Sequence, residues 1–186
     1  MPGQATLPGN PLLTEQALAD VHAQCHAWAL NCCRGRREEA LEVLQTAYVH
    51  VLEGRARFDG RSSLRTWMFA VVRNLARSRW RRQLLGRRIE LPQDGAAWEA
   101  VADPAPAHSE NAESAATHGR LLAAFEALPA RQREVLALVF AHEHSIEQAA
   151  AVLGLAVGTA RTHYERGKQS LRQRMGIVVG APGGTP

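Results

Sequence analysis

The chain has 186 residues, of which 46% are hydrophobic and 22% charged, as in a soluble globular protein with one large domain or two small ones. No stretch approaches the roughly 18 apolar residues that cross a bilayer, and the N-terminus lacks the basic and apolar regions of a secretion signal. We therefore expect a cytoplasmic protein without membrane insertion.

The net charge of +4 hides a basic, acidic, basic pattern along the chain. The stretch from Arg55 to Arg88 holds 11 arginines and one acid, whereas residues 89–119 hold six acids and neither Lys nor Arg. Eight basic residues follow between Arg120 and Arg174. Arginine pairs with phosphate and aromatic rings stack on unpaired bases, so the pattern predicts two nucleic-acid-binding modules.

Three cysteines, Cys25, Cys32 and Cys33, lie near His22 and His26. An odd cysteine count in a cytoplasmic chain argues against a disulfide framework, and no CxxC pair is present. Metal binding or redox sensing stays a minor alternative, and buried thiols are the favoured interpretation. We expect no metal and no cofactor.

The first half predicts an all-α unit. After a disordered tail over residues 1–11, helices are expected over Thr14–Leu30, Arg37–Leu52 and Ser63–Leu84, with Thr14 capping the first. No segment is typical of a strand. The residues expected in the core are Leu18, Val21, Cys25, Trp28 and Ala29, then Leu41, Leu44, Tyr48, Val51 and Leu52, then Leu64, Trp67, Met68, Val71, Val72 and Leu75.

The second half follows a Pro- and acid-containing segment, residues 89–118, that predicts a flexible linker. Helices are expected again from Arg120, with core faces formed by Leu121, Leu122, Phe125 and Leu128, and then by Val135, Leu136, Val139 and Phe140. Ser145 and Gln148 form a capping box at the start of the next helix, Gly154 ends it, and a last helix covers Val157–Met175.

Residues 145–168 have the layout of a helix-turn-helix. The second helix of this motif offers basic and hydroxyl side chains that suit base edges and phosphates in a major groove. They are Thr159, Arg161, Thr162, His163, Arg166 and Lys168.

Two groups of motifs then resemble a known family. FDGRSSLRTW at 58–67 and AVVRNLA at 70–76 are similar to region 2 of bacterial extracytoplasmic-function (ECF) sigma factors, of the sigma-70 family of RNA polymerase. LPARQREV at 128–135, SIEQAA at 145–150 and LGLAVGTAR at 153–161 are similar to their region 4. The resemblance covers residues 12–175 and implies region 2 over 12–88, region 4 over 119–175 and a C-terminal tail over 176–186.

The resemblance implies a sigma factor that recognises promoter DNA and directs its opening, with no catalytic activity of its own. Region 2 would hold a flipped base of the −10 element and contact the neighbouring strand through Phe58, Asp59, Arg61, Ser62, Ser63, Arg65, Arg73, Asn74, Arg77 and Arg81. Trp67 is expected in the core instead. Region 4 would read the −35 element through the second helix of its helix-turn-helix.

The resemblance also implies binding to core RNA polymerase, at the β′ clamp and the β flap, and an anti-sigma partner. The residues implied at the β′ clamp are Glu38, Glu39, Glu42, Gln45 and Tyr48. Leu41 stands where the family has an acid, Ala156 where a Ser commonly caps the recognition helix, and His163 where Arg is usual. The alternative function is a helix-turn-helix regulator whose first half acts as a sensor.

Overall fold

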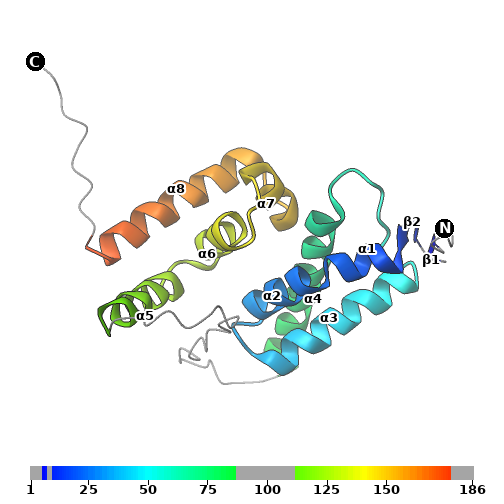
Figure 1. Cartoon of the computed structure of the whole chain (residues 1–186), viewed down its shortest axis with the longest axis horizontal. Coiled ribbons are helices and arrows are strands. Elements are labelled where there is room, and N and C mark those ends of the chain that lie inside the picture. The colour runs from blue at the N-terminus through cyan, green and yellow to red at the C-terminus, as the bar shows by residue number, and fades with distance from the viewer. Residues whose placement is uncertain (1–5, 8–9, 87–111, 177–186) are drawn as a thin grey trace, which may run out of the picture. The chain divides into compact units, whose positions relative to one another are not determined.

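The computed structural model describes residues 6–7, 10–86 and 112–176. The chain divides into two compact units, one formed by residues 1–101 with 151–155 and the other by 102–150 with 156–186. The first contains the elements from β1 to α4, and the second contains α5 to α8, apart from the end of α7. Both are helical (Figure 1), which agrees with the all-α expectation.

The first unit begins with a two-stranded antiparallel sheet, β1 (Thr6–Leu7) and β2 (Asn10–Thr14). This N-terminal hairpin corrects two predictions, since a disordered tail was expected over residues 1–11 and no strand anywhere. Residues 1–5, 8 and 9 of that predicted tail lie outside the described residues. Leu7, Asn10 and Leu13 are buried, which stabilises the two strands. An alternation of so few residues carries too weak a signal to be read from the sequence.

Four helices follow the hairpin: α1 (Glu15–Asp20), α2 (His22–Cys32), α3 (Arg37–Leu52) and α4 (Leu64–Gly86). The predicted cap is confirmed, because Thr14 Oγ1 accepts a hydrogen bond from the Ala17 N–H at 3.2 Å. The single helix predicted over Thr14–Leu30 is divided at Val21, whose backbone turns to φ −101° and ψ −1°. The bounds of α3 are those predicted.

The core of the first unit lies between α2, α3 and α4. The Trp28 and Phe69 rings stack with centroids 5.4 Å apart, and the Trp28 indole N–H donates to the Phe69 carbonyl at 3.0 Å. Phe69 was not expected in the core, yet it is fully buried. The other residues buried here include Cys25, Ala29, Ala40, Val43, Leu44, Ala47, Val51, Met68 and Val72.

The second unit contains α5 (Ala112–Glu126), α6 (Ala130–Leu136), the π-helix η1 (Ala137–Ala141), α7 (Ile146–Leu153) and α8 (Val157–Arg174). Helix α5 begins inside the predicted linker, so residues 112–118 are helical, while 89–111 lie outside the described residues. The predicted C-terminal tail also lies outside them, apart from Gly176. Ala124 and Leu128 are buried as α5 packs on α8, whereas Leu121, expected in the core, is exposed.

The π-helix changes which residues after α6 face inward. The His142 N–H donates to the Ala137 carbonyl at 3.1 Å, one residue further along than in an α-helix. This wider turn rotates the following side chains. Leu138 is therefore buried, and Phe140, predicted in the core, is 62% exposed.

Two further features of the second unit are the cap of α7 and the close approach of α6 to α8. The capping box is confirmed, because the Ser145 N–H donates to Gln148 Oε1 at 2.9 Å and the Gln148 N–H donates to Ser145 Oγ at 3.1 Å. Helices α6 and α8 meet at Gly167, where an added Cβ would lie 2.9 Å from Leu136 Cδ1. A larger residue at this position would force Leu136 to shift.

Candidate nucleic-acid interface

The connection between α3 and α4, residues 53–63, forms the α3–α4 turn. Gly54 and Gly60 adopt positive φ angles of 70° and 74°, which L side chains rarely tolerate. At the tip, the Asp59 carboxylate accepts the Arg61 N–H at 3.1 Å and lies 3.3 Å from the Arg61 guanidinium. Both side chains are exposed, so the tip offers an acceptor and a donor to solvent.

An aromatic pair joins this turn to the first turns of α4. The Phe58 and Trp67 rings lie 5.3 Å apart at a tilt of 53°, and both residues are partly exposed. Ser63, between them in sequence, caps α4 by accepting the Thr66 N–H at 3.2 Å. Trp67, predicted in the core, therefore packs against Phe58 at the rim of the unit.

Helix α4 carries the predicted cations in three different environments. On α4, Asn74, Arg77 and Arg81 are exposed and follow an i, i+3, i+7 spacing along one face, while Arg65 is partly exposed, as is Ser62 just before the helix. Arg73 is only 2% exposed, which is not the solvent-facing position expected for it. A contact between Arg73 and DNA stays a prediction.

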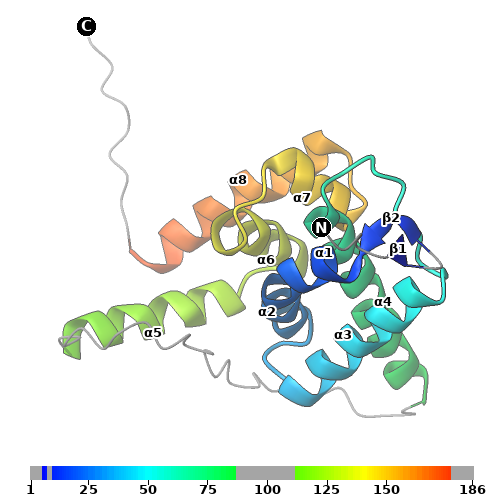
Figure 2. The same ribbon diagram turned by 45° about the vertical axis from the view of Figure 1, so that its right-hand side comes forward.

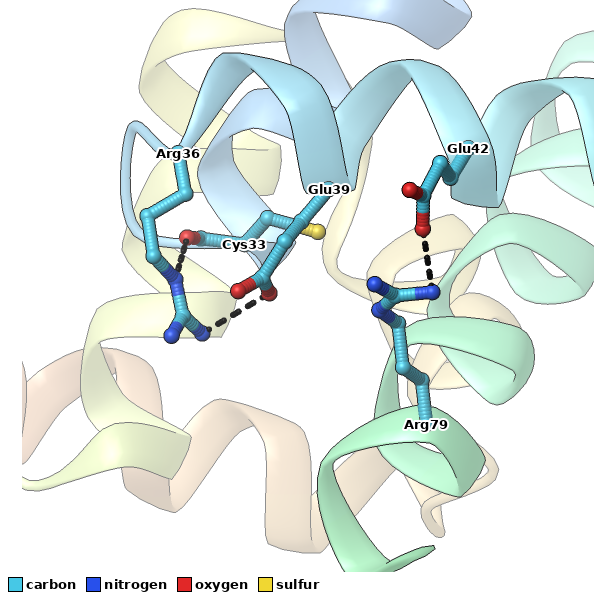
Figure 3. A network of polar contacts seen from close by, with 5 residues as sticks. All are labelled: Cys33, Arg36, Glu39, Glu42 and Arg79. Carbon is cyan, nitrogen blue, oxygen red and sulfur yellow. Dashed lines mark hydrogen bonds and ion pairs between the residues drawn. The ribbon is translucent and has the colours of Figure 1, made fainter. Parts of the chain in front are cut away.

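Arg79 forms an ion pair with Glu42 of α3 (Figure 3). In the same view, Arg36 donates from Nε to the Cys33 carbonyl at 3.1 Å and pairs with Glu39 at 3.1 Å. Two of the acids implied at the polymerase surface thus have partners within the chain. Sequence spacing could not reveal the Arg79 pair, because its members lie on different helices.

The outer face of α3 is more apolar than the sequence predicts. Leu41 and Leu52 are each 47% exposed and Val49 is exposed beside them, so the prediction that Leu41 and Leu52 lie in the core is wrong. Ala40 and Ala47 occupy the buried face instead, since small side chains let neighbouring helices approach. Glu38, Glu42 and Gln45 are exposed as well.

Tyr48 contacts α2 through His22. The Tyr48 hydroxyl lies 3.0 Å from His22 Nδ1, and the two rings stack with centroids 5.8 Å apart. Burial, followed by the nearby Cys25 thiol, raises the pKa of Tyr48 to about 12. Tyr48 is therefore a neutral phenol that is partly exposed at the side of the α3 face.

Helix α8 exposes most of the predicted base-reading residues near its start. Thr159, Arg161, Thr162 and Arg166 are exposed, whereas Ala160 is buried against the unit. The Thr162 hydroxyl donates to the Gly158 carbonyl at 2.9 Å, and Arg161 lies 3.8 Å from Glu147 of α7. A hydrogen bond from its own backbone, the Ser145 hydroxyl and the Arg161 charge lower the pKa of Glu147. As expected from Ala156, no side chain caps α8.

The side chains of Lys168 and His163 are less exposed than those of Thr159, Arg161, Thr162 and Arg166. Lys168 Nζ lies 3.4 Å from the Glu165 carboxylate and 4.6 Å from the centre of the Tyr164 ring. Tyr164 in turn stacks on the exposed Phe140, with centroids 5.8 Å apart. Both predicted residues are only partly exposed, so the accessible polar face of α8 is concentrated at Thr159–Arg166.

Cys25 and Cys33 are buried free thiols, and Cys32 is partly exposed. Burial raises the pKa of Cys25 to about 12 and that of Cys33 to about 11, which keeps both thiols protonated and unreactive near neutral pH. Within the described residues, no group of three or more metal-ligating side chains comes together. No helix in that part of the chain is long and apolar enough to cross a membrane.

Comparisons with known proteins identify both halves of the chain. Residues 16–84 match the family model of sigma-70 region 2, and residues 118–171 match that of sigma-70 region 4. The region 2 match does not favour the alternative of a stand-alone helix-turn-helix regulator.

Curated relatives match over most of the chain. An ECF RNA polymerase sigma factor, EcfG of Rhodopseudomonas palustris, is 31% identical, over 89% of this chain and 86% of the relative. Another, SigX of Bacillus subtilis, is 27% identical, over 76% of this chain and 73% of the relative. A solved structure of the sigma factor RpoE of Bartonella quintana, in complex with the anti-sigma factor NepR, shares the fold with a TM-score of 0.62. It is 24% identical, over 88% of this chain and 96% of RpoE. The chain therefore belongs to the ECF sigma factors of RNA polymerase.

Proposed function

We propose that this sigma factor divides promoter recognition between its two units. Helix α8 of the second unit reads the −35 element as duplex, and the α3–α4 turn with α4 of the first unit opens and holds the −10 element. The observation that supports this division most directly is that each unit has its own exposed polar and cationic surface, of different construction.

For the −10 element, the proposed contacts start at the α3–α4 turn. Taking a base out of the stack costs a few kcal/mol, which a shaped pocket beside a cationic helix offsets. The Phe58 and Trp67 rings provide aromatic surface, and Asp59 and Arg61 provide an acceptor and a donor for base edges. Ser62, Ser63, Arg65, Asn74, Arg77 and Arg81 then follow the strand, with Arg73 as a further candidate.

For the −35 element, Arg161 is the proposed base-reading residue. A bidentate contact of arginine with guanine contributes about 1–3 kcal/mol of discrimination. Thr159, Thr162 and Arg166 share its exposed face, and His163 and Lys168 lie at its side. The distance of 3.8 Å to Glu147 is too long for a strong ion pair, so the guanidinium can turn toward DNA.

Core polymerase is the proposed partner of the outer α3 face. An exposed apolar patch with a polar rim is typical of protein interfaces, and Leu41, Val49 and Leu52 form such a patch beside Glu38, Glu42 and Gln45. Glu39 and Tyr48 border it. The second unit is proposed to bind the β flap, as in the family.

An anti-sigma protein is the proposed regulatory partner, since RpoE of Bartonella quintana, which shares the fold, was solved with NepR bound. We further propose that the chain works where RNA polymerase does, in the cytoplasm, and that it contributes no catalytic residue.

Run-off transcription with purified core polymerase tests the proposal. The protein should bind core polymerase and direct initiation at specific members of a genomic fragment library. A stand-alone regulator would bind duplex fragments without needing core polymerase. If core polymerase with this chain starts transcription at no fragment above the level of core polymerase alone, the proposed function is wrong.

A further inference from the structure

The N-terminal hairpin lies beside the α3–α4 turn (Figure 2), and Asn10 at the start of β2 forms hydrogen bonds with that turn. Asn10 is only 1% exposed, so its amide depends on partners within the chain. Its Nδ2 donates to the Val51 carbonyl at 2.6 Å and to the Ala56 carbonyl at 3.0 Å. Its Oδ1 accepts the Phe58 N–H at 2.8 Å.

These three bonds use both donors and the acceptor of one amide, which no other side chain of similar size can supply. They connect Val51 at the end of α3, and Ala56 and Phe58 in the α3–α4 turn, to one side chain. Buried polar networks of this kind specify one conformation when every member is satisfied.

A second contact reaches the tip of the turn. Leu12 is 61% exposed, and its Cδ1 lies 3.7 Å from the position that a Cβ on Gly60 would occupy. Gly60 is next to Asp59 and Arg61, the polar pair at the tip. The hairpin thus braces the turn at its base through Asn10 and at its tip through Leu12.

We propose that the N-terminal hairpin sets the base specificity of the α3–α4 turn, with Asn10 as the positioning residue and Leu12 as a brace of the tip. This inference rests on the proposed function of the turn. Neither residue touches DNA in the proposal. Both act by fixing the positions of Phe58, Asp59 and Arg61 in the α3–α4 turn, where a base of the −10 element is proposed to bind.

Two readouts test this proposal. The first is the affinity of the complex with core polymerase for single-stranded oligonucleotides that carry the −10 sequence of a promoter found by run-off transcription, together with all single-base variants. We expect Asn10→Ala to lower the ratio between the preferred and the worst base about tenfold and Leu12→Ala about threefold. Gln16→Ala, an exposed change just beyond the hairpin, should leave it unchanged.

The second readout is amide hydrogen exchange in the free protein. Exchange over residues 53–63 should speed up in Asn10→Ala, while the amides of α2 and α4 keep their protection, which shows that the variant is folded. The Leu12→Ala variant removes only an exposed side chain and serves as the test if Asn10→Ala unfolds.

The outcomes separate the two ideas. If the wild-type complex shows no preference among bases, the proposed function of the turn fails and this inference fails with it. If the wild type discriminates and both variants discriminate equally well, with unchanged exchange in the turn, the positioning role of the hairpin is overturned while the function of the turn stands.

Discussion

The two DNA-binding surfaces of this protein are built in different ways. In α8, the residues proposed to read duplex DNA lie within about three turns of one regular helix, and the helix geometry alone places them together. In the first unit, the surface joins the α3–α4 turn, the start of α4 and a hairpin more than 40 residues upstream, as shown by the separation of 48 between Asn10 and Phe58. A duplex presents a regular groove, whereas a flipped base needs a shaped pocket, and only long-range contacts make such a pocket rigid.

The largest expected effect comes from breaking the core of the first unit alone. Phe69→Ala removes the buried ring that stacks on Trp28 and should destabilise this unit by about 3–5 kcal/mol. Among the described residues, all three tryptophans, Trp28, Trp67 and Trp80, belong to the first unit, so the midpoint of the tryptophan fluorescence change on heating reports its unfolding.

Phe69→Leu is the matched control and should cost less, because it keeps most of the buried volume. Binding of the −35 duplex should persist in Phe69→Ala at temperatures where fluorescence shows the first unit unfolded. Loss of both together would mean that the units do not unfold separately.

Overpacking the second unit has the next largest effect. Gly167→Ala places a methyl group 2.9 Å from Leu136 Cδ1 and should destabilise α6 against α8 by about 1–3 kcal/mol. The far-UV circular dichroism midpoint should fall, while the tryptophan midpoint stays near the wild-type value.

Gly158→Ala is its control on the same helix. No atom lies within 4 Å of the added Cβ, and alanine is the better helix former, so this variant should be as stable as the wild type or slightly more stable. A lower midpoint in Gly158→Ala than in Gly167→Ala would contradict the close approach of α6 and α8.

Asn74→Ala and Arg161→Ala separate the functions of the two surfaces. Arg161→Ala should weaken binding of −35 duplex by about 1–3 kcal/mol with little effect on a pre-opened template. Asn74→Ala should reduce opening, measured by permanganate reactivity of unpaired thymines, more than it reduces duplex binding. Equal losses in both assays for both variants would contradict the division between the units.

The smallest effect concerns the two helix caps. Ala156→Ser supplies the missing cap of α8 and should stabilise the second unit by about 0.5–2 kcal/mol, as judged by circular dichroism. Ser63→Ala removes the cap of α4 and should lower the free energy of unfolding of the first unit by a similar amount. This change would appear as a lower midpoint temperature of the tryptophan fluorescence. A stabilised Ser63→Ala variant would show that the cap costs the first unit more than it contributes.

Much of this protein could be predicted from local patterns. The bounds of α3, the Thr14 cap, the Ser145 and Gln148 capping box and the exposed face of α8 all depend on residues within a few positions of each other. The family was also evident from its motifs, because region 2 and region 4 each carry a contiguous set of residues.

The predictions of buried residues were wrong where helix packing or an irregular helix overrides the apolar spacing of the sequence. Leu41 and Leu52 have the spacing of core residues, but Ala40 and Ala47 allow closer packing against neighbouring helices, so the leucines face outward. Phe140 continues the apolar spacing of α6, and the π-helix turns it to the surface.

The sequence by itself determined the helices, the helix-turn-helix and the family, since hydrogen bonds within a helix and contiguous motifs are local. Only the tertiary structure decided that residues 10–14 form a strand, that Arg79 pairs with Glu42, and that Asn10 supports the α3–α4 turn. These contacts join residues far apart in the chain, and their energies depend on packing that no local spacing encodes.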